Sequence, residues 1–255
     1  MYIDTHCHLD FKNYDEDREI VIQRAIKSDI QAIITIGTNI ETSKMAIKLA
    51  ENYASVFAAV GIHPTDCLQT TDEHLETIEE LSKHEKVVAI GEVGLDYYHM
   101  KATKEKQQSI FRKQIDLAVR QNLPLIIHNR DSHDDIYDII TTSSSSKVGG
   151  VMHSFSGDMD FLEKILLTNL HVSFTGNITF KKSNNTPLVE RSPIQQLLLE
   201  TDSPFLTPTP LRGKRNEPAF LVHTAKKIAE IKNLDVNEVG YVTTENAKKL
   251  FRLNV

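Results

Sequence analysis

Short apolar segments alternate with longer amphipathic segments along almost the whole chain. The apolar segments are rich in β-branched residues, which favour strands, and the amphipathic segments repeat with helical spacing. The predicted strands are Tyr2–Asp4, Gln31–Ile36, Val56–Gly61, Val87–Gly91, Leu125–Ile127, Gly150–Met152, His171–Phe174 and Gln196–Leu199. The predicted helices are Asp15–Ser28, Glu41–Tyr53, Asp72–His84, Thr103–Gln121, Asp134–Thr142, Asp158–Leu167, Glu217–Lys232 and Asp235–Phe251.

This alternation predicts parallel βαβ units, since each strand is followed by a segment long enough for a crossover helix. Two α/β architectures satisfy it: a closed (β/α)8 TIM barrel and an open, doubly wound sheet. Residues 187–195 do not clearly favour a helix or a strand. Nothing in the chain marks a linker, so we expect one domain spanning residues 1–255.

The composition excludes some classes of protein but does not indicate a function. Basic residues number 29 against 35 acidic ones, a net charge of −6, whereas proteins that coat nucleic acid are usually basic. No apolar run is long enough for a membrane span, and the first ten residues do not resemble a signal peptide. Two cysteines, Cys7 and Cys67, are too few for a disulfide scaffold, so we expect a cytoplasmic protein.

Side chains able to bind metal follow the ends of the predicted strands. In a closed barrel the carboxyl ends of the strands meet on one face, and that face carries the active site. Seven such side chains, distant in sequence, would then share one cavity. They are His6, His8, His63, Glu92, His128, His153 and Asp202.

The pair His6 and His8 follows the first predicted strand. Residues two apart on a strand point to the same side, so both imidazoles can reach one metal ion. The alternative is a pair of exposed polar residues. Cys7 would point away from both histidines, and we expect it to pack in the core.

Glu92 follows an apolar run, where an unpaired charge needs a cation. Its two oxygens could bridge two metal ions, although a salt bridge with a neighbouring base is the alternative. Asp96 is expected to orient a neighbour or cap the following turn rather than bind metal.

His128 and His153 each end a short apolar run at the same relative point, which favours two ligands over two core histidines. Asp202 ends the last strand and could bind metal and accept a proton, or simply cap a turn. We interpret His63 as a contact for the substrate or transition state rather than a primary ligand, with a structural histidine as the alternative.

With these residues placed, the sequence strongly resembles the TatD family of metal-dependent deoxyribonucleases over essentially its full length. Seven motifs carry the resemblance, in order along the chain. They begin at Asp4 (DTHCH), Gly61 (GIHP), Gly91 (GEVGLDY), Ile127 (IHNR), His153 (HSFSG), Glu200 (ETDSP) and Arg212 (RGKRNEP).

The resemblance implies a TIM barrel with one or two divalent metal ions that hydrolyses phosphodiester bonds, typically as a 3′–5′ exodeoxyribonuclease. Carried over residue by residue, it implies that His6, His8, Glu92 and Asp202 hold one metal ion. It implies that Glu92, His128 and His153 hold the second. Glu92, Asp202 and His63 are then the catalytic candidates.

The leading hypothesis is therefore a metal-dependent phosphodiesterase whose substrate is DNA that is single-stranded or has frayed ends. Four basic residues are candidates for gripping backbone phosphates: Arg130, Arg212, Lys214 and Arg215. A solvated loop is the alternative interpretation of residues 212–215, although barrel phosphate sites often form after the eighth strand.

Two other hypotheses remain: a metal-dependent amidohydrolase acting on a small cyclic amide, and a non-enzymatic nucleic-acid-binding protein. The ligand set leaves the metal open among Mg, Mn, Zn and Ni, although imidazole-rich sites suit transition metals better than Mg. We expect no membrane association and no obligate protein partner.

Overall fold

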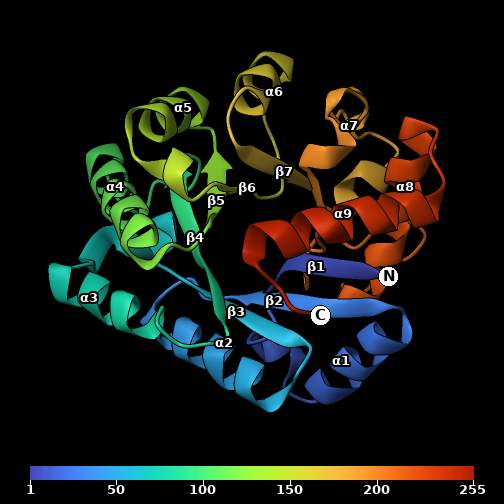
Figure 1. The fold of residues 1–255 in the computed structure, drawn as a ribbon, viewed down its shortest axis with the longest axis horizontal. Coiled ribbons are helices and arrows are strands. Elements are labelled where there is room, and N and C mark those ends of the chain that lie inside the picture. Colours follow the sequence, from blue (N-terminus) through green and yellow to red (C-terminus); the bar gives the residue numbers. More distant parts are fainter.

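Eight parallel strands form one sheet in the computed structural model, which describes all of residues 1–255. Their order in the sheet is their order in the chain (Figure 1). The strands are β1 Tyr2–Cys7, β2 Ile30–Ile36, β3 Val56–Val60, β4 Val87–Asp96, β5 Leu125–Arg130, β6 Gly150–Met152, β7 Leu170–Phe174 and β8 Leu197–Leu199.

Backbone bonds between β1 and the segment after β8 close the sheet. The Asp202 amide donates to the His6 carbonyl at 2.9 Å, and the His8 amide donates to the Ser203 carbonyl at 2.8 Å. Cys7 also pairs with Ser203 as an isolated parallel bridge. The predicted (β/α)8 TIM barrel is confirmed, and the open sheet is excluded.

Helices follow the strands around the outside of the barrel (Figure 1). They are α1 Arg18–Lys27, α2 Ile40–Asn52, α3 Asp72–Leu81, α4 Lys104–Gln121, α5 His133–Thr142, α6 Met159–Leu166, α7 Thr186–Arg191, α8 Leu221–Lys232 and α9 Val236–Phe251. The segment that the sequence left undecided contains α7, a helix of 6 residues that begins with a proline in its first turn. Such a short helix carries too few turns for a periodic pattern to reveal it.

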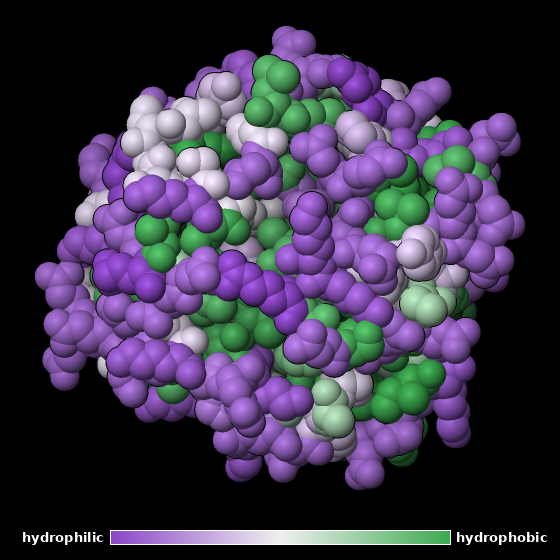
Figure 2. All heavy atoms as spheres, viewed as in Figure 1, coloured by the Kyte–Doolittle hydropathy of each residue, from purple (hydrophilic) through white to green (hydrophobic).

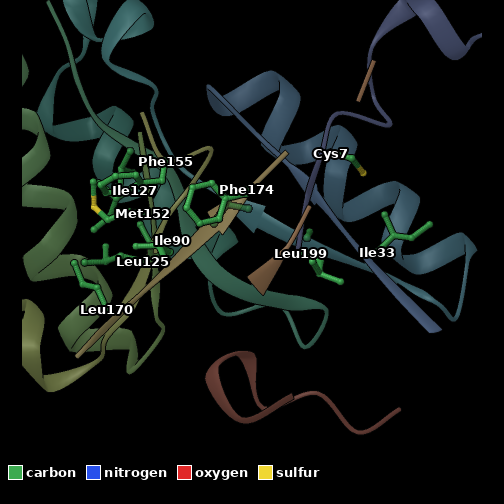
Figure 3. Packing of buried hydrophobic residues seen from close by; sticks show 14 of the residues in the cluster. Cys7, Ile33, Ile90, Leu125, Ile127, Met152, Phe155, Leu170, Phe174 and Leu199 are labelled. Carbon is green, nitrogen blue, oxygen red and sulfur yellow. The ribbon is translucent and has the colours of Figure 1, made fainter. Parts of the chain in front are cut away.

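Two layers of apolar side chains hold the barrel together. The larger one joins the outward-facing residues of the strands to the helices, and Figure 3 shows part of it around Phe155 and Phe174. The smaller one contains inward-facing strand residues such as Ile34 and Ile126. Alternation along each strand sends successive side chains to these two layers.

The last helix, α9, lies across the amino ends of β1 and β8 (Figure 1). The Asn246 side chain donates to the Leu197 carbonyl at 2.9 Å, and Phe251 joins the inner apolar layer. This end of the barrel is therefore sealed by apolar packing.

The outer face in the same view is mostly hydrophilic, with hydrophobic residues in separate patches (Figure 2). No helix combines the length and the apolar character that crossing a bilayer requires.

Three strands extend further than the apolar pattern predicts, and all three carry site residues. β1 runs to Cys7 rather than to Asp4, β4 to Asp96 rather than to Gly91, and β5 to Arg130 rather than to Ile127. A Cβ on Gly94 would lie 2.0 Å from the His128 carbonyl oxygen, and Gly94 has a φ of +137°. Only glycine allows β4 and β5 to approach this closely, which keeps Glu92 and His128 on neighbouring strands.

Candidate metal centre

The seven strand-end side chains converge at the carboxyl end of the barrel, although they come from six different strands or the residues that follow them. His6 lies in β1 and His8 just after it, Glu92 in β4 and His128 in β5. The other three follow strand ends: His63 after β3, His153 after β6 and Asp202 after β8. Five of the seven side chains are at most 12% exposed, and those of Asp202 and His128 are 16% and 17% exposed, because each faces the others across the mouth of the barrel.

Glu92 occupies the middle of the cluster and directs its two oxygens to different neighbours. Oε1 lies 2.8 Å from His128 Nδ1, 3.4 Å from His153 Nε2 and 3.5 Å from His63 Nε2. Oε2 lies 3.5 Å from His6 Nε2 and 4.0 Å from His8 Nε2. A carboxylate with one oxygen on each side is the arrangement that bridging two cations requires.

Asp202 completes the side of the cluster formed by β1. Its Oδ1 lies 3.7 Å from His8 Nε2 and 3.8 Å from His6 Nε2. Asp202 has a φ of +51°, a left-handed conformation that aspartate tolerates better than most residues with a side chain. That conformation lies at the turn that leads from β8 into the following loop.

Three overlapping sets of donor atoms are close enough to hold a metal ion. They are His6, His8 and Glu92; His6, His153 and Asp202; and His63, Glu92 and His128. The first set agrees with the ligands that the TatD resemblance implies. The other two group the residues differently, because the rings of His153 and His6 are stacked at 3.7 Å and His63 approaches Glu92 directly.

Hydrogen bonds fix the orientation of most of these imidazole rings. His63 Nδ1 lies 2.7 Å from the Thr65 hydroxyl and accepts from the Thr65 amide, so its Nε2 faces Glu92. His8 Nδ1 lies 3.3 Å from the Ile36 carbonyl. Partners of this kind set the tautomer and aim the other nitrogen, as they do around metal-binding histidines in general.

Glu200, which is fully buried beneath the cluster, orients His153. Its Oε1 lies 3.0 Å from His153 Nδ1 and accepts the Ser154 amide at 2.7 Å, and its Oε2 accepts the Ser173 hydroxyl at 2.6 Å. Sequence reasoning did not assign Glu200 a role. The signal was present, because a charged residue directly after the apolar strand β8 needs a partner, as Glu92 does after its apolar run.

Asp96 plays the orienting role that the sequence predicts. Its Oδ2 lies 3.1 Å from His128 Nε2, and its Oδ1 accepts the backbone amides of Tyr98 and His99. It therefore positions His128 and caps the turn after β4. Cys7 also behaves as predicted: it is fully buried in the larger apolar layer.

The charges of the cluster depend on burial and on the neighbouring groups. Burial lowers the pKa of His8 to about 3, so this ring is neutral with a free lone pair. Burial raises the pKa of Asp202 to about 6. Burial acts to raise the pKa of Glu92 as well, but the charges of His63 and His153 hold it well below its usual range.

The donors fit a divalent transition metal ion. Imidazoles, which bind in their neutral form, and ionised carboxylates are the ligands that zinc, nickel and manganese accept, and within each of the three sets the donor atoms lie within 4.8 Å of one another. His6 Nδ1 is buried without a hydrogen-bond partner, whereas its Nε2 faces Glu92 and Asp202. Buried carboxylates need positive charge beside them, which a bound metal ion or protonated imidazoles supply.

Three of the four predicted phosphate-binding side chains are exposed and form no ion pair. They are Arg130, Arg212 and Lys214. The Arg130 guanidinium lies over the Tyr98 ring at 4.8 Å, and that of Arg212 lies over the Phe180 ring at 3.7 Å. Their charges remain available to a ligand.

Arg215 is different from the neighbouring basic residues, because its guanidinium already has a carboxylate partner. It forms two bonds to the Asp17 carboxylate, at 2.7 and 2.8 Å, and it stacks over the Tyr14 ring. A guanidinium whose donors already bind a carboxylate anchors its loop to the barrel, and we leave Arg215 out of the phosphate-binding set.

Two loops beside the cluster carry no acidic residue. We call them the β7 and β8 loops, residues 175–185 and 203–216. The Thr209 amide donates to the Thr179 hydroxyl at 2.8 Å and holds the two loops together. Between them lies a pocket of about 440 Å³, lined by Asn177, Phe180, Lys181, Lys182, Ser183, Asn184, Asn185 and Arg212. In a chain of net charge −6, this is a local concentration of unpaired positive charge.

Comparison with known proteins identifies the family. The sequence model described as TatD related DNase matches residues 3–252. The chain belongs to the TatD family. It is 46% identical over 100% of both chains to a Bacillus subtilis protein named as an uncharacterized metal-dependent hydrolase, YabD.

Other members of the TatD family are similar over the same length. The chain is 34% identical to a Pectobacterium carotovorum protein named 3′-5′ ssDNA/RNA exonuclease TatD, covering 98% of this chain and 99% of the other. The crystal structure of the Escherichia coli TatD homologue YJJV superposes with a TM-score of 0.93 at 31% identity, covering 99% and 98% of the two chains. These relatives establish that the protein is a metal-dependent hydrolase of this family.

Proposed function

We propose that this protein is a deoxyribonuclease that removes nucleotides from the 3′ end of single-stranded DNA. The observation that carries the proposal is the combination of unpaired basic side chains on the β7 and β8 loops, the second of which begins directly after Asp202, with a cluster of metal-binding donors. A phosphodiester needs both features, whereas a small neutral amide needs only the second. The name of the Pectobacterium carotovorum relative supports the same substrate class.

In this proposal, His6, His8, Glu92 and Asp202 hold one divalent ion, and Glu92, His128 and His153 hold the second. Such ions, when bound, neutralise charge on the phosphodiester and make water more acidic. The opposed oxygens of Glu92 support its bridging role.

The remaining roles belong to side chains of the chain itself. Asp202 accepts the proton of the attacking water, because it lies at the edge of the cluster and retains some exposure. His63 contacts the phosphodiester from the β3 side, next to Glu92. Glu200 and Asp96 hold His153 and His128 in position.

Arg130, Arg212 and Lys214 bind backbone phosphates outside the cluster. Arg130 ends β5, and Arg212 and Lys214 lie in the loop after β8, so in this proposal a strand that crosses the cluster passes between them. We further propose that residues 1–255 act as one domain, and that the protein works in the cytoplasm, in keeping with its two free, buried cysteines.

The test uses the metal-reconstituted protein with single-stranded DNA labelled at the 3′ or the 5′ end, beside a panel of cyclic amides. We expect 5′-labelled strands to shorten stepwise from the 3′ end, and a chelator to stop the reaction. Hydrolysis of cyclic amides with intact DNA would contradict the proposal in favour of an amidohydrolase.

A further inference from the structure

An aromatic pair, Phe11 and Phe205, lies beside the candidate metal centre. The Phe11 ring stacks on the His8 ring with centroids 4.6 Å apart and planes 22° apart. The Phe205 ring meets Phe11 edge-on at 6.0 Å and lies 6.4 Å from the His8 ring. An apolar surface therefore borders a cluster made of imidazoles and carboxylates.

The two rings reach this place by the same local geometry. Each aromatic residue follows a proposed ligand by three positions, and its amide donates back to that residue. The Phe11 amide donates to the His8 carbonyl at 3.2 Å, and the Phe205 amide to the Asp202 carbonyl at 2.9 Å. The two turns carry one ring each to the edge of the barrel mouth.

Side-chain hydrogen bonds hold both turns firmly. Arg18 donates to the Phe11 carbonyl at 3.3 Å, and the buried Asn216 side chain donates to the Phe205 carbonyl at 2.6 Å. The Tyr14 hydroxyl in turn donates to the Asn216 carbonyl at 2.6 Å. The rings are thus presented on a fixed backbone, and binding at them needs no ordering of the loop.

Phe205 is 52% exposed, which its packing does not explain. Single exposed apolar residues are common on protein surfaces and need no function. Phe205 differs because its ring is paired, its backbone is fixed, and a proposed ligand ring lies next to it. Moreover, its loop contains three basic residues and no acidic one, which favours an anionic ligand that carries an aromatic group.

We propose that the Phe11–Phe205 pair stacks a nucleobase of the bound strand, next to the bond being hydrolysed. This inference rests on the proposed function. Stacking on aromatic side chains accepts every base, since each has a π-face, and it requires an unpaired base. The pair would therefore select single-stranded over duplex substrate, with Arg212 and Lys214 of the same loop on the phosphates.

The test exploits the absence of tryptophan from the chain. Phe205→Trp introduces one fluorescent ring at the pair. The matched control is Tyr241→Trp, because Tyr241 is an aromatic residue that is 59% exposed and lies on α9, at the amino end of the barrel. Each variant is titrated with a single-stranded oligonucleotide whose phosphorothioate linkages resist cleavage. A scan then replaces one base at a time with an abasic residue.

We expect binding to quench the fluorescence of Phe205→Trp, with the quench lost when the abasic residue occupies one particular position. The fluorescence of Tyr241→Trp should stay unchanged. With cleavable DNA, Phe205→Ala should raise KM on the order of tenfold, as the loss of one stacked base predicts, and leave kcat nearly constant. Phe205→Tyr should retain the wild-type KM, because it keeps the ring.

Saturation by the oligonucleotide with no change in the Phe205→Trp fluorescence would overturn the inference. So would a signal that depends on protein concentration alone, which would indicate that a second copy of the chain covers the rings. Failure of the proposed function gives a different result. A position-specific quench in a protein that cuts no DNA would support the stacking site and contradict the proposed nuclease activity. DNA cleavage without a quench would support the nuclease activity and contradict the stacking site.

Discussion

The two ends of the barrel are built from opposite kinds of residue. At the amino end, the strands start at apolar residues or glycine, and α9 seals them. These starts are Tyr2, Ile30, Val56, Val87, Leu125, Gly150, Leu170 and Leu197. At the carboxyl end, six of the same strands lead into imidazoles and carboxylates that face one another.

The comparison shows that the residues that stabilise the barrel and the residues that form the candidate site lie at opposite ends of it. Apolar burial at the amino end stabilises the fold without restricting the loops at the other end. The carboxyl end then tolerates buried polar groups whose mutual contacts suit a ligand better than they suit folding. Substitutions at the two ends should consequently have separable effects.

Glu92→Gln should give the largest effect on activity. The substitution preserves size and removes the charge that faces His6 on one side and His128 on the other. We expect a fall in kcat on the order of 10³-fold, together with reduced metal content. Measuring kcat, metal content and melting temperature on this variant separates the roles, since a salt bridge alone would lower the melting temperature and leave turnover within about tenfold.

Phe251→Ala should give the converse result at the amino end. The ring is 3% exposed in the inner apolar layer, and its truncation should lower the free energy of unfolding by about 3–5 kcal/mol. Metal content and kcat of the folded protein should match the wild type, because the carboxyl end is untouched. A loss of metal from folded Phe251→Ala would show that the two ends are coupled.

Arg212→Ala with Lys214→Ala should have a smaller, salt-dependent effect. Loss of two phosphate contacts should weaken binding of single-stranded DNA and flatten the slope of log affinity against log salt by about 1.4. Hydrolysis of a small activated phosphodiester should barely change.

The matched control is Lys27→Ala with Lys147→Ala, which removes two exposed charges just before β2 and β6, at the amino end. Equal losses of DNA affinity in both double variants would mean that overall charge, rather than the β8 loop, attracts the strand.

Sequence periodicity predicted the barrel and located the candidate ligands because strand ends and metal-binding residue types coincide. It misplaced the ends of β1, β4 and β5, since His6, Glu92 and His128 are polar residues inside strands and interrupt the apolar pattern. The contacts of Arg215 with Asp17 and of Glu200 with His153 could not be predicted, because these residues are distant in sequence. Such contacts depend on the closed barrel, which no local pattern encodes.

The way in which the metal-binding donors group into sets could not be predicted from the sequence either. Spacing alone could not show that His63 approaches Glu92 as closely as His6 does, at 3.5 Å in both cases. Conversely, the proximity of His6 and His8 was predictable, since residues two apart on a strand point to the same side.

The metal content of His128→Ala with His153→Ala, measured by elemental analysis beside the wild type, tests the central claim most directly. Of the three donor sets, only His6, His8 and Glu92 stays whole in this variant. We predict one or two divalent ions per chain in the wild type and a clear reduction in the double variant, with the melting temperature nearly retained. Unchanged metal content in the double variant would contradict the assignment of the carboxyl end as the metal centre.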